Sequence, residues 1–493
     1  MKHILKFTFP ILLLFAVSCK DFLNREPLDQ LTEESFYKTK NDVEKALIGN
    51  YVPMQDVEWN GKDWMITEVP TDNSAPGGTD PDFTPIDNFA VTPDNIVVAN
   101  YWAIHYRQIT LSNTIITKVA QMDLDQGTKD PLTAEAMFLR AVAYFDLVRI
   151  YGAVPLITEP PVFGDDLFYP RSPVDDVYAL IISDFDFASK HLPKVWSGLS
   201  EGRATKGAAL AYLSKIYLTR REYVKARDAA QLVIASGVYD LLPDYGDNFE
   251  LGTADNSKEA IFQVQFTGCG PFGTGNSRQA FFAPWGEGIT KDRDGWGSQI
   301  PTSPILNNPN TTIVDAFEAG DLRKYYTVMT AGKHYPTINP GDGGYTYPAA
   351  GASASAANIK KFVVGSGPNI CFMSTPLNSS LVRYSDVLLN YAEALMEIGG
   401  GVTSNPLALD AFNKVHQRAG LPPLTEIDRE IMLHERRVEF AFEGHRWFDL
   451  LRSGKAIETM LLHGKNINLY NLLFPIPAGE MQINSKLVQN PGY

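Results

Sequence analysis

The stretch HERRVEFAFEGHRWFDLLR, residues 434–452, decides how the rest of this sequence is interpreted. On a helix, Glu435, Glu439 and Glu443 stand four residues apart and share one face. Apolar and aromatic residues lie between them, so the carboxylates stand at the margin of a buried face. Buried charges are tolerated when an opposite charge pairs with them, and Arg436 stands three residues before Glu439. The stretch therefore predicts a buried ion-pair network that includes Glu435, Arg436, Glu439 and Glu443.

Two features of this stretch bear on its role. Gly444 suits the end of a first helix, and a second helix is expected to begin near Arg446 at an angle to it. Carboxylates and two histidines permit acid–base catalysis in principle. A zinc-protease motif is excluded, because the second histidine of HExxH is replaced by Val438. We interpret the network as structural, locking two helices to the rest of the fold.

The composition describes a globular protein with an acidic surface. The chain of 493 residues has no low-complexity linker, and 44% of its residues are hydrophobic and 20% charged. Its 57 acidic and 43 basic residues give a formal net charge of -14. Most of such a surface repels nucleic-acid phosphates, and the sequence shows no basic stripe. We therefore expect no nucleic-acid partner.

Residues 1–18 have the pattern of a signal peptide, and Cys19 follows them. Basic residues precede an apolar run at 7–17 that is too short to span a bilayer. Small residues then lead into Cys19, which resembles a bacterial lipobox whose cysteine becomes the lipidated first residue of the mature protein. An ordinary secretory signal with an incidental cysteine is the alternative. The sequence leaves open whether the other two cysteines, Cys269 and Cys371, pair or stay free.

Residues 205–237 carry the spacing of a tetratricopeptide-like helical hairpin. Its characteristic positions hold Leu210, Leu213, Ser214, Tyr217, Tyr223, Ala226, Ala230 and Val233. Small residues among them let two helices approach closely. A second copy, broken by an insertion, runs from Tyr384 to Val415, and generic hairpins are the alternative interpretation. We predict a mostly α fold: a tetratricopeptide-like hairpin scaffold with long irregular loops and a few short strands.

Two blocks, residues 54–100 and 239–380, are irregular and rich in Pro, Gly and aromatic residues. Loops of this length are commonly functional, and their aromatic content argues against disorder. The G-x-G-x-x-G spacing at 268–273 is not a dinucleotide site, because Pro271 removes a backbone donor and no helix pattern follows. The D-x-D-G at 292–295 lacks the terminal Glu of a calcium loop. We predict no cofactor or metal site, with a structural calcium ion left open.

Aromatic side chains in these blocks are the candidates for ligand binding. Their rings can stack on the C–H faces of sugars, while nearby polar groups meet the hydroxyls. The candidate ligand-binding residues are Trp64, Asp72, Phe83, Trp285 and Trp296. If the two blocks converge on one face of the scaffold, these rings form a shallow platform. Packing into the core is the alternative role for each ring.

Four stretches together resemble the SusD/RagB family of outer-membrane lipoproteins. They are FLRAVAYFDLVRIYGAVPL at 138–156, RYSDVLLNYAEA at 383–394, the stretch at 434–452 and QNPGY at 489–493. The resemblance implies a SusD-like α-α superhelix that forms a single domain over residues 19–493. The helical scaffold is then expected at about 30–240 and 380–460, with a loop-rich ligand-binding insert at about 241–379.

The resemblance also implies a function. Family members are lipid-anchored at the outer membrane and bind nutrients beside a SusC-like TonB-dependent transporter. We therefore expect a surface-exposed lipoprotein that captures a glycan for such a partner. A tetratricopeptide-type adaptor and a RagB-like peptide-binding lipoprotein are the alternatives. The family's ligand residues lie in loops that have no match here, so none is transferred.

An enzyme is the remaining class. The sequence contains no GxSxG, P-loop, HExxH or CxxC motif, so no catalytic residue is assigned. A glycoside hydrolase stays formally open, because the separation of two carboxylates is not visible in a sequence. We expect binding without catalysis.

Overall fold

The computed structural model describes residues 36–76, 80–162, 164, 167–270, 275–284, 289, 312–348, 357–371 and 373–493. Helices dominate these ranges and the strands are short, so the predicted fold class is confirmed. Across the described part of the chain, every helix is too short or too polar to cross a lipid bilayer.

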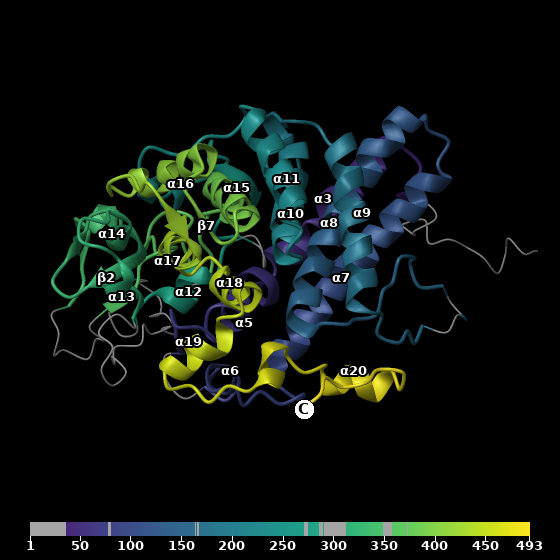
Figure 1. Cartoon of the computed structure of the whole chain (residues 1–493). Helices are drawn as coiled ribbons and strands as arrows, with labels where there is room; N and C mark the ends of the chain where they lie inside the picture. The colour runs from purple at the N-terminus through teal and green to yellow at the C-terminus, as the bar shows by residue number, and fades with distance from the viewer. Residues whose placement is uncertain are drawn as a thin grey trace, which may run out of the picture.

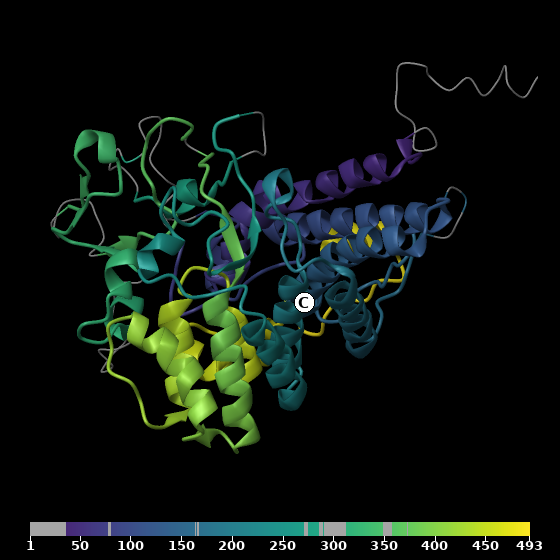
Figure 2. The same cartoon turned by 90° about the horizontal axis from the view of Figure 1, so that it is seen from above.

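The longest helices form the scaffold. They are α7 (Ile96–Gln121), α8 (Gln126–Tyr151), α9 (Val174–His191), α10 (Lys206–Thr219), α11 (Tyr223–Ala235), α15 (Tyr384–Ile398) and α16 (Pro406–Arg418). Each packs against the next, and α11 packs against α15 although the whole insert separates them in sequence. Seen from above, the row runs from the blue helices α7 and α8 to the green helices α15 and α16 (Figure 2). Figure 1 shows the insert beside one end of this row.

Small side chains allow the helices at the centre of the row to pack closely. Ala226 and Ala230 lie on the buried face of α11. On α10, Ser214 is buried, and its Oγ accepts a 3.2 Å hydrogen bond from Asn390 Nδ2 on α15. The residues of the predicted hairpin thus connect three scaffold helices.

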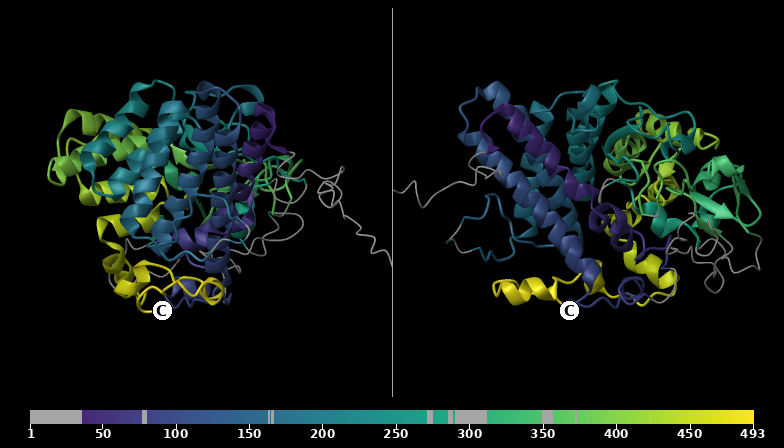
Figure 3. Two further views of the ribbon diagram at one scale, coloured as in Figure 1. Left: turned by 90° about the vertical axis from the view of Figure 1, so that its right-hand side faces the viewer. Right: turned by 180° about the vertical axis from the view of Figure 1, so that it is seen from behind.

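The shorter helical elements fill the space around the scaffold. The α-helices are α3 (Lys40–Asn50), α4 (Val52–Gln55), α5 (Asp63–Thr67), α6 (Thr84–Asp87), α12 (Arg278–Phe282), α13 (Ile313–Ala316), α14 (Arg323–Thr327), α17 (Arg429–Glu439), α18 (Arg446–Ser453), α19 (Ala456–Leu462) and α20 (Ala478–Ile483). The other turns are the π-helical η1 (Val57–Gly61) and the 3-10 turns η2 (Gly198–Ser200), η3 (Tyr245–Asn248), η4 (Pro340–Asp342) and η5 (Leu469–Leu472). Seen from behind, α3 lies along α7 and α8 (Figure 3).

The strands pair as two-stranded antiparallel ribbons within the described residues. The pairs are β1 (Ala260–Val264) with β6 (Ser379–Arg383), β2 (Val328–Thr330) with β5 (Ala357–Ile359), β3 (His334–Tyr335) with β4 (Tyr345–Thr346), and β7 (Val402–Thr403) with β8 (Ile427–Asp428). The β1–β6 pair brings the two ends of the insert together. The insert therefore leaves and rejoins the scaffold at one place.

The first irregular block differs from its prediction as a loop. Residues 52–67 form the consecutive short helices α4, η1 and α5, which pack into the core. Their buried side chains include Met54, Trp59 and Trp64. Pro53 and Gly61 hide the helical period at this length, because each helix lasts only one turn or slightly more.

The stretch at 434–452 forms α17, a turn and α18. The first helix ends at Glu439, earlier than the predicted end at Gly444. The intervening turn contains Phe442 at φ 65° and Gly444 at φ 79°. Glu443 therefore lies in the turn and not on the helix, although it remains buried near Glu439. The positive φ of Phe442 is a conformation that L-residues rarely adopt, so the surrounding contacts must hold this turn.

The C-terminal segment, from α19 to the last residue, passes along the lower edge of the molecule in Figures 1 and 3. It is tied to the end of α8 by a 2.9 Å bond from Phe474 N–H to the Ile150 carbonyl. Asn490 Nδ2 also donates to the Tyr151 carbonyl at 3.1 Å. These bonds close the scaffold at its lower end.

Candidate functional site

Glu439, the last residue of α17, lies at the centre of a buried cluster of charges. Its Oε1 accepts bonds from Arg418 at 2.6 Å and Arg383 at 2.9 Å, and its Oε2 accepts one from Arg323 at 3.2 Å. The surrounding carboxylates bind the same cations. We call this set the ion-pair core: Glu259, Asp321, Arg323, Lys361, Arg383, Arg418, Glu435, Glu439 and Glu443.

The ion-pair core joins the insert to the C-terminal helices. Glu443 accepts bonds from Arg383 through both carboxylate oxygens and a 2.8 Å bond from Lys361 Nζ. Glu435 accepts a 2.6 Å bond from Arg323 and lies 2.8 Å from His416 Nδ1. Since Arg323 and Lys361 belong to the insert, their contacts with Glu435 and Glu443 bridge the insert to the α17 region.

The electrostatics of the ion-pair core suit a structural role. Burial alone would raise the pKa of Glu439, but Arg418, Arg383 and Arg323 hold this pKa well below its usual range. Burial opposes Arg383 and Lys361 in the same way at Glu443, whose pKa is also lowered. Carboxylates held ionised in this way are poor proton donors near neutral pH. The cavity beside Glu443 has a volume of about 60 Å³, far below the roughly 300 Å³ at which ligand pockets begin.

Arg436 has partners other than the predicted Glu439. Its Nε donates to Asp449 on α18 at 3.0 Å, and its two terminal nitrogens donate to Asp386 at 3.0 Å and Asn390 at 2.9 Å on α15. The reason is that Glu439 is already bound by three arginines from other elements. Arg436 instead ties α17 to α15 and α18, so it forms a second buried set of charges next to the first.

The candidate ligand residues of the first block lie inside the protein. Trp64 is 3% exposed and packs against Phe281, Phe282 and the half-buried Phe83, with ring centroids 5.6–6.4 Å apart. Asp72 is 2% exposed. These positions correct the expectation of an open platform at Trp64 and Phe83, because both rings are occupied by core contacts. Trp285 and Trp296 lie outside the described residues.

Asp72 forms an ion pair with Arg446, the first residue of α18. Its carboxylate accepts bonds from Arg446 Nε at 2.8 Å and Nη2 at 2.7 Å, and it lies 3.0 Å from Arg437. Burial works against these arginines, yet together they lower the pKa of Asp72 well below its ordinary value. Asp72 therefore anchors α18 to the first block and is not free for a ligand.

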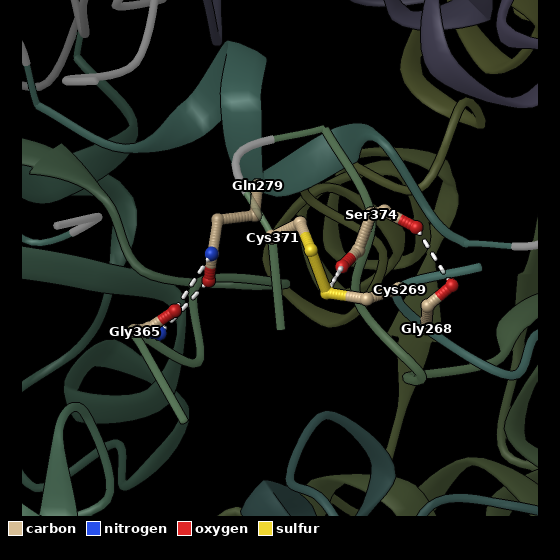
Figure 4. The surroundings of a disulfide bond; sticks show 6 residues. All are labelled: Gly268, Cys269, Gln279, Gly365, Cys371 and Ser374. Carbon is tan, nitrogen blue, oxygen red and sulfur yellow. Dashed lines mark hydrogen bonds between the residues drawn. A yellow bond between two sulfur atoms is a disulfide. The ribbon is translucent and has the colours of Figure 1, made fainter. Parts of the chain in front are cut away.

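Cys269 and Cys371 form a disulfide bond, with their Cα atoms 5.5 Å apart (Figure 4). The alternative of two free thiols does not apply in this structure. Ser374 Oγ donates a 2.8 Å hydrogen bond to the Gly268 carbonyl, which fixes the chain beside the disulfide. Gln279 exchanges two 2.8 Å bonds with the backbone of Gly365 nearby. The disulfide thus links the first and last parts of the insert.

An open groove lies beside α14, within the expected ligand-binding insert but at residues that the sequence had not singled out. It has a volume of about 650 Å³. Its aromatic and cationic walls are formed by Tyr245, Lys324, Tyr325, Tyr326, Lys333 and Tyr335, and we call it the tyrosine groove. The pair Tyr325–Tyr326 beside a lysine was a visible signal. Its other walls come from distant positions, so the groove could not be assembled from the sequence.

Metal ligands do not converge in the described residues. No group of three or more His, Cys, Asp or Glu side chains there could hold a metal ion. The D-x-D-G at 292–295 lies outside the described residues, so this possible calcium site is not tested.

The fold is a helical repeat scaffold with a loop-rich insert, and comparisons place it among known proteins. The family model described as SusD family matches residues 258–493, and the model described as starch-binding associating with outer membrane matches residues 21–218. SusD-like protein P2 of Formosa agariphila is 29% identical over 520 residues, which cover 99% of each chain. This chain belongs to the SusD/RagB family.

Solved structures agree with the whole fold. A crystal structure with xylogluco-oligosaccharide matches 90% of this chain and 97% of its own, with a TM-score of 0.77 and 25% identity. A laminarin-binding SusD-like protein matches 93% of this chain and 100% of its own, with a TM-score of 0.75 and 28% identity. The architecture of this chain is therefore that of SusD-like proteins.

Proposed function

We propose that this protein is a cell-surface glycan-binding lipoprotein that captures an oligosaccharide and passes it to a SusC-like TonB-dependent transporter. One observation carries the proposal: the fold agrees over at least nine-tenths of the chain with a structure containing xylogluco-oligosaccharide and with a laminarin-binding protein. The rigid scaffold and the ion-pair core hold a loop-rich insert in place. Binding residues are commonly found on loops that such a scaffold positions.

The proposed ligand site includes Trp285 and Trp296, the two insert tryptophans expected from the sequence. Large indole faces suit the C–H faces of a sugar ring. Trp64, Asp72 and Phe83 are excluded from this site because their contacts are made inside the protein. They support the scaffold from which the insert extends.

The test is binding of the purified mature protein to neutral glycans, among them xylogluco-oligosaccharides and laminarin. We expect the double variant Trp285→Ala/Trp296→Ala to lose about tenfold or more in affinity, because each stacking ring contributes on the order of 1 kcal/mol. The matched control is Trp196→Ala, a half-buried tryptophan outside both irregular blocks. Thermal melting of each variant separates lost binding from lost folding.

Two results would contradict this proposal. One is the absence of binding to every glycan tested. The other is sustained turnover of a bound glycan by the pure protein, abolished by a change of one carboxylate, which would assign an enzyme instead.

The transporter partner has its own test. Affinity-tagged protein purified from detergent-solubilised outer membranes should retain a TonB-dependent transporter in a fixed ratio. Retention that is unchanged after the tagged protein is replaced by an unrelated lipoprotein would remove the support for this partnership.

A further inference from the structure

The tyrosine groove presents rigid aromatic surface. Tyr325 is 37% exposed, and its ring stacks on Tyr335 with centroids 5.1 Å apart. It also meets the edge of Tyr326 at 5.2 Å. The Tyr325 hydroxyl donates to the His334 carbonyl at 3.0 Å, and the Tyr326 hydroxyl donates to Asp244 at 2.8 Å. The rings are therefore held in place before any ligand arrives, which reduces the entropic cost of binding.

Two lysines, Lys324 and Lys333, line the groove. Among the described residues, no carboxylate lies within ion-pair distance of Lys324 or Lys333. The other cations nearby are already matched. Arg418 binds Glu259 and Glu439, and buried Lys360 lies 3.7 Å from a carboxylate oxygen of Glu250.

The acidic groups of the groove do not cancel these lysines. Asp321 is bound to Arg323 at 2.9 Å. Asp244 accepts hydrogen bonds from the Tyr326 hydroxyl and the Gly246 N–H, and within the described ranges it is the lining carboxylate without an ion pair. As far as the described residues show, two unmatched lysines thus face one unpaired carboxylate, on a protein whose net charge is -14. The groove is therefore a locally basic site on an acidic protein.

We propose that the tyrosine groove binds a saccharide that carries carboxylate or sulfate groups. A sugar ring stacks on Tyr325, and its anionic groups are met by Lys324 and Lys333. The volume of about 650 Å³ falls within the range of small-molecule sites. The groove is lined by residues of α14, β2 and β3. Binding of an anionic saccharide there would add a ligand class to the proposed function, on which this inference builds.

The test compares three probes with purified mature protein: oligogalacturonides, sulfated galactan oligosaccharides and neutral laminari-oligosaccharides. We expect Tyr325→Ala to weaken binding of the charged probes about tenfold, the loss of one stacking contact. The double variant Lys324→Gln/Lys333→Gln should weaken their binding about fivefold or more at low salt, and less at high salt. Binding by carboxylated probes, sulfated probes or both identifies the anionic group.

The matched control is Lys225→Gln/Lys414→Gln, which removes the same charge from two exposed lysines elsewhere. Thermal melting confirms folding of all variants. The proposal is overturned if neither charged probe binds, or if the groove and control variants bind the charged probes alike. Binding of the neutral laminari-oligosaccharides is measured in parallel. It distinguishes failure of the groove proposal from failure of the proposed function, because binding of neutral glycans through Trp285 and Trp296 can persist when the groove proposal fails.

Discussion

The Glu439 carboxylate pairs with arginines from three different elements. Arg323 comes from α14, Arg383 from β6 and Arg418 from the end of α16. A buried pair is not by itself stabilising, because removing charges from water opposes the Coulombic gain. Removing one member, however, leaves the others buried without compensation. Single substitutions in the ion-pair core should therefore be far more harmful than their contacts alone suggest.

We predict that Glu439→Gln lowers the free energy of unfolding by about 3 kcal/mol or more, because three arginines lose part of their compensation. Urea denaturation followed by circular dichroism measures this change. The control is Glu44→Gln, which removes a surface pair with Lys40 and should cost about 0.5 kcal/mol or less. Equal effects of the two substitutions would show that the core charges contribute no more than surface charges.

A second prediction concerns Glu68, which is buried and accepts a 2.8 Å bond from the Gly444 N–H. Burial raises the pKa of Glu68 to about 8. The folded protein then holds a proton that the unfolded chain releases above its ordinary pKa of 4.5. Stability from this group therefore falls as pH rises from about 4.5 to about 8.

Glu68→Gln removes this titration. Relative to the unmodified protein, the variant should gain about 1 kcal/mol or more in unfolding free energy between pH 5 and pH 8, since each pKa unit corresponds to about 1.4 kcal/mol. Denaturation curves at the two pH values test it. An identical pH dependence in both proteins would mean that Glu68 is ionised in the folded state.

At the scale of residues, the sequence indicated which charges need an opposite charge, but not which residues supply it. The spacing of Glu435, Glu439 and Glu443 predicted that their charges must be matched, but most of their cations come from positions far along the chain. Trp64 shows the same limit, because a tryptophan in a proline-rich block can stack on a ligand or fill a core. Its contact with Phe282, more than 200 residues away, decides the role.

At the scale of elements, the disulfide is the main covalent constraint on the insert. It joins Cys269 and Cys371 across a sequence separation of 102 residues. We predict that Cys269→Ala/Cys371→Ala lowers the free energy of unfolding by about 2–5 kcal/mol, the usual effect of removing a native disulfide. Thermal melting with and without reductant measures it. The double variant should be insensitive to reductant, and a reductant effect that persists in it would assign the loss elsewhere.

The long helices could be predicted because they span several turns. The small-residue spacing of α10 and α11 is repeated often enough to be recognised. One-turn helices such as α4 and α5 are too short to show a recurring apolar spacing, so the sequence of their block was interpreted as irregular. The end of α17 was misplaced because Gly444 does have the positive φ expected of it, but the helix already ends at Glu439 and the glycine belongs to the turn that follows.

At the scale of the whole molecule, the expected attachment to the membrane depends on Cys19. We predict that Cys19→Ala moves the exported protein from the outer-membrane fraction to a soluble fraction, because lipidation of this cysteine is the proposed anchor. Fractionation and immunoblotting test this in cells that lack the transporter partner. Membrane retention of the variant under these conditions would rule out lipid anchoring through Cys19.

The ion-pair core also limits which segments can be exchanged between related proteins in a chimera. Arg323 and Lys361 approach from the insert, and Glu439 and Glu443 accept their bonds from the α17 region. A chimera that takes its insert from a relative keeps this ion-pair core only if that insert places cations where Arg323 and Lys361 stand. A chimera that folds must therefore keep the charged residues of the insert and those of the α17 region together. The tips of the loops can be replaced without disturbing the ion-pair core.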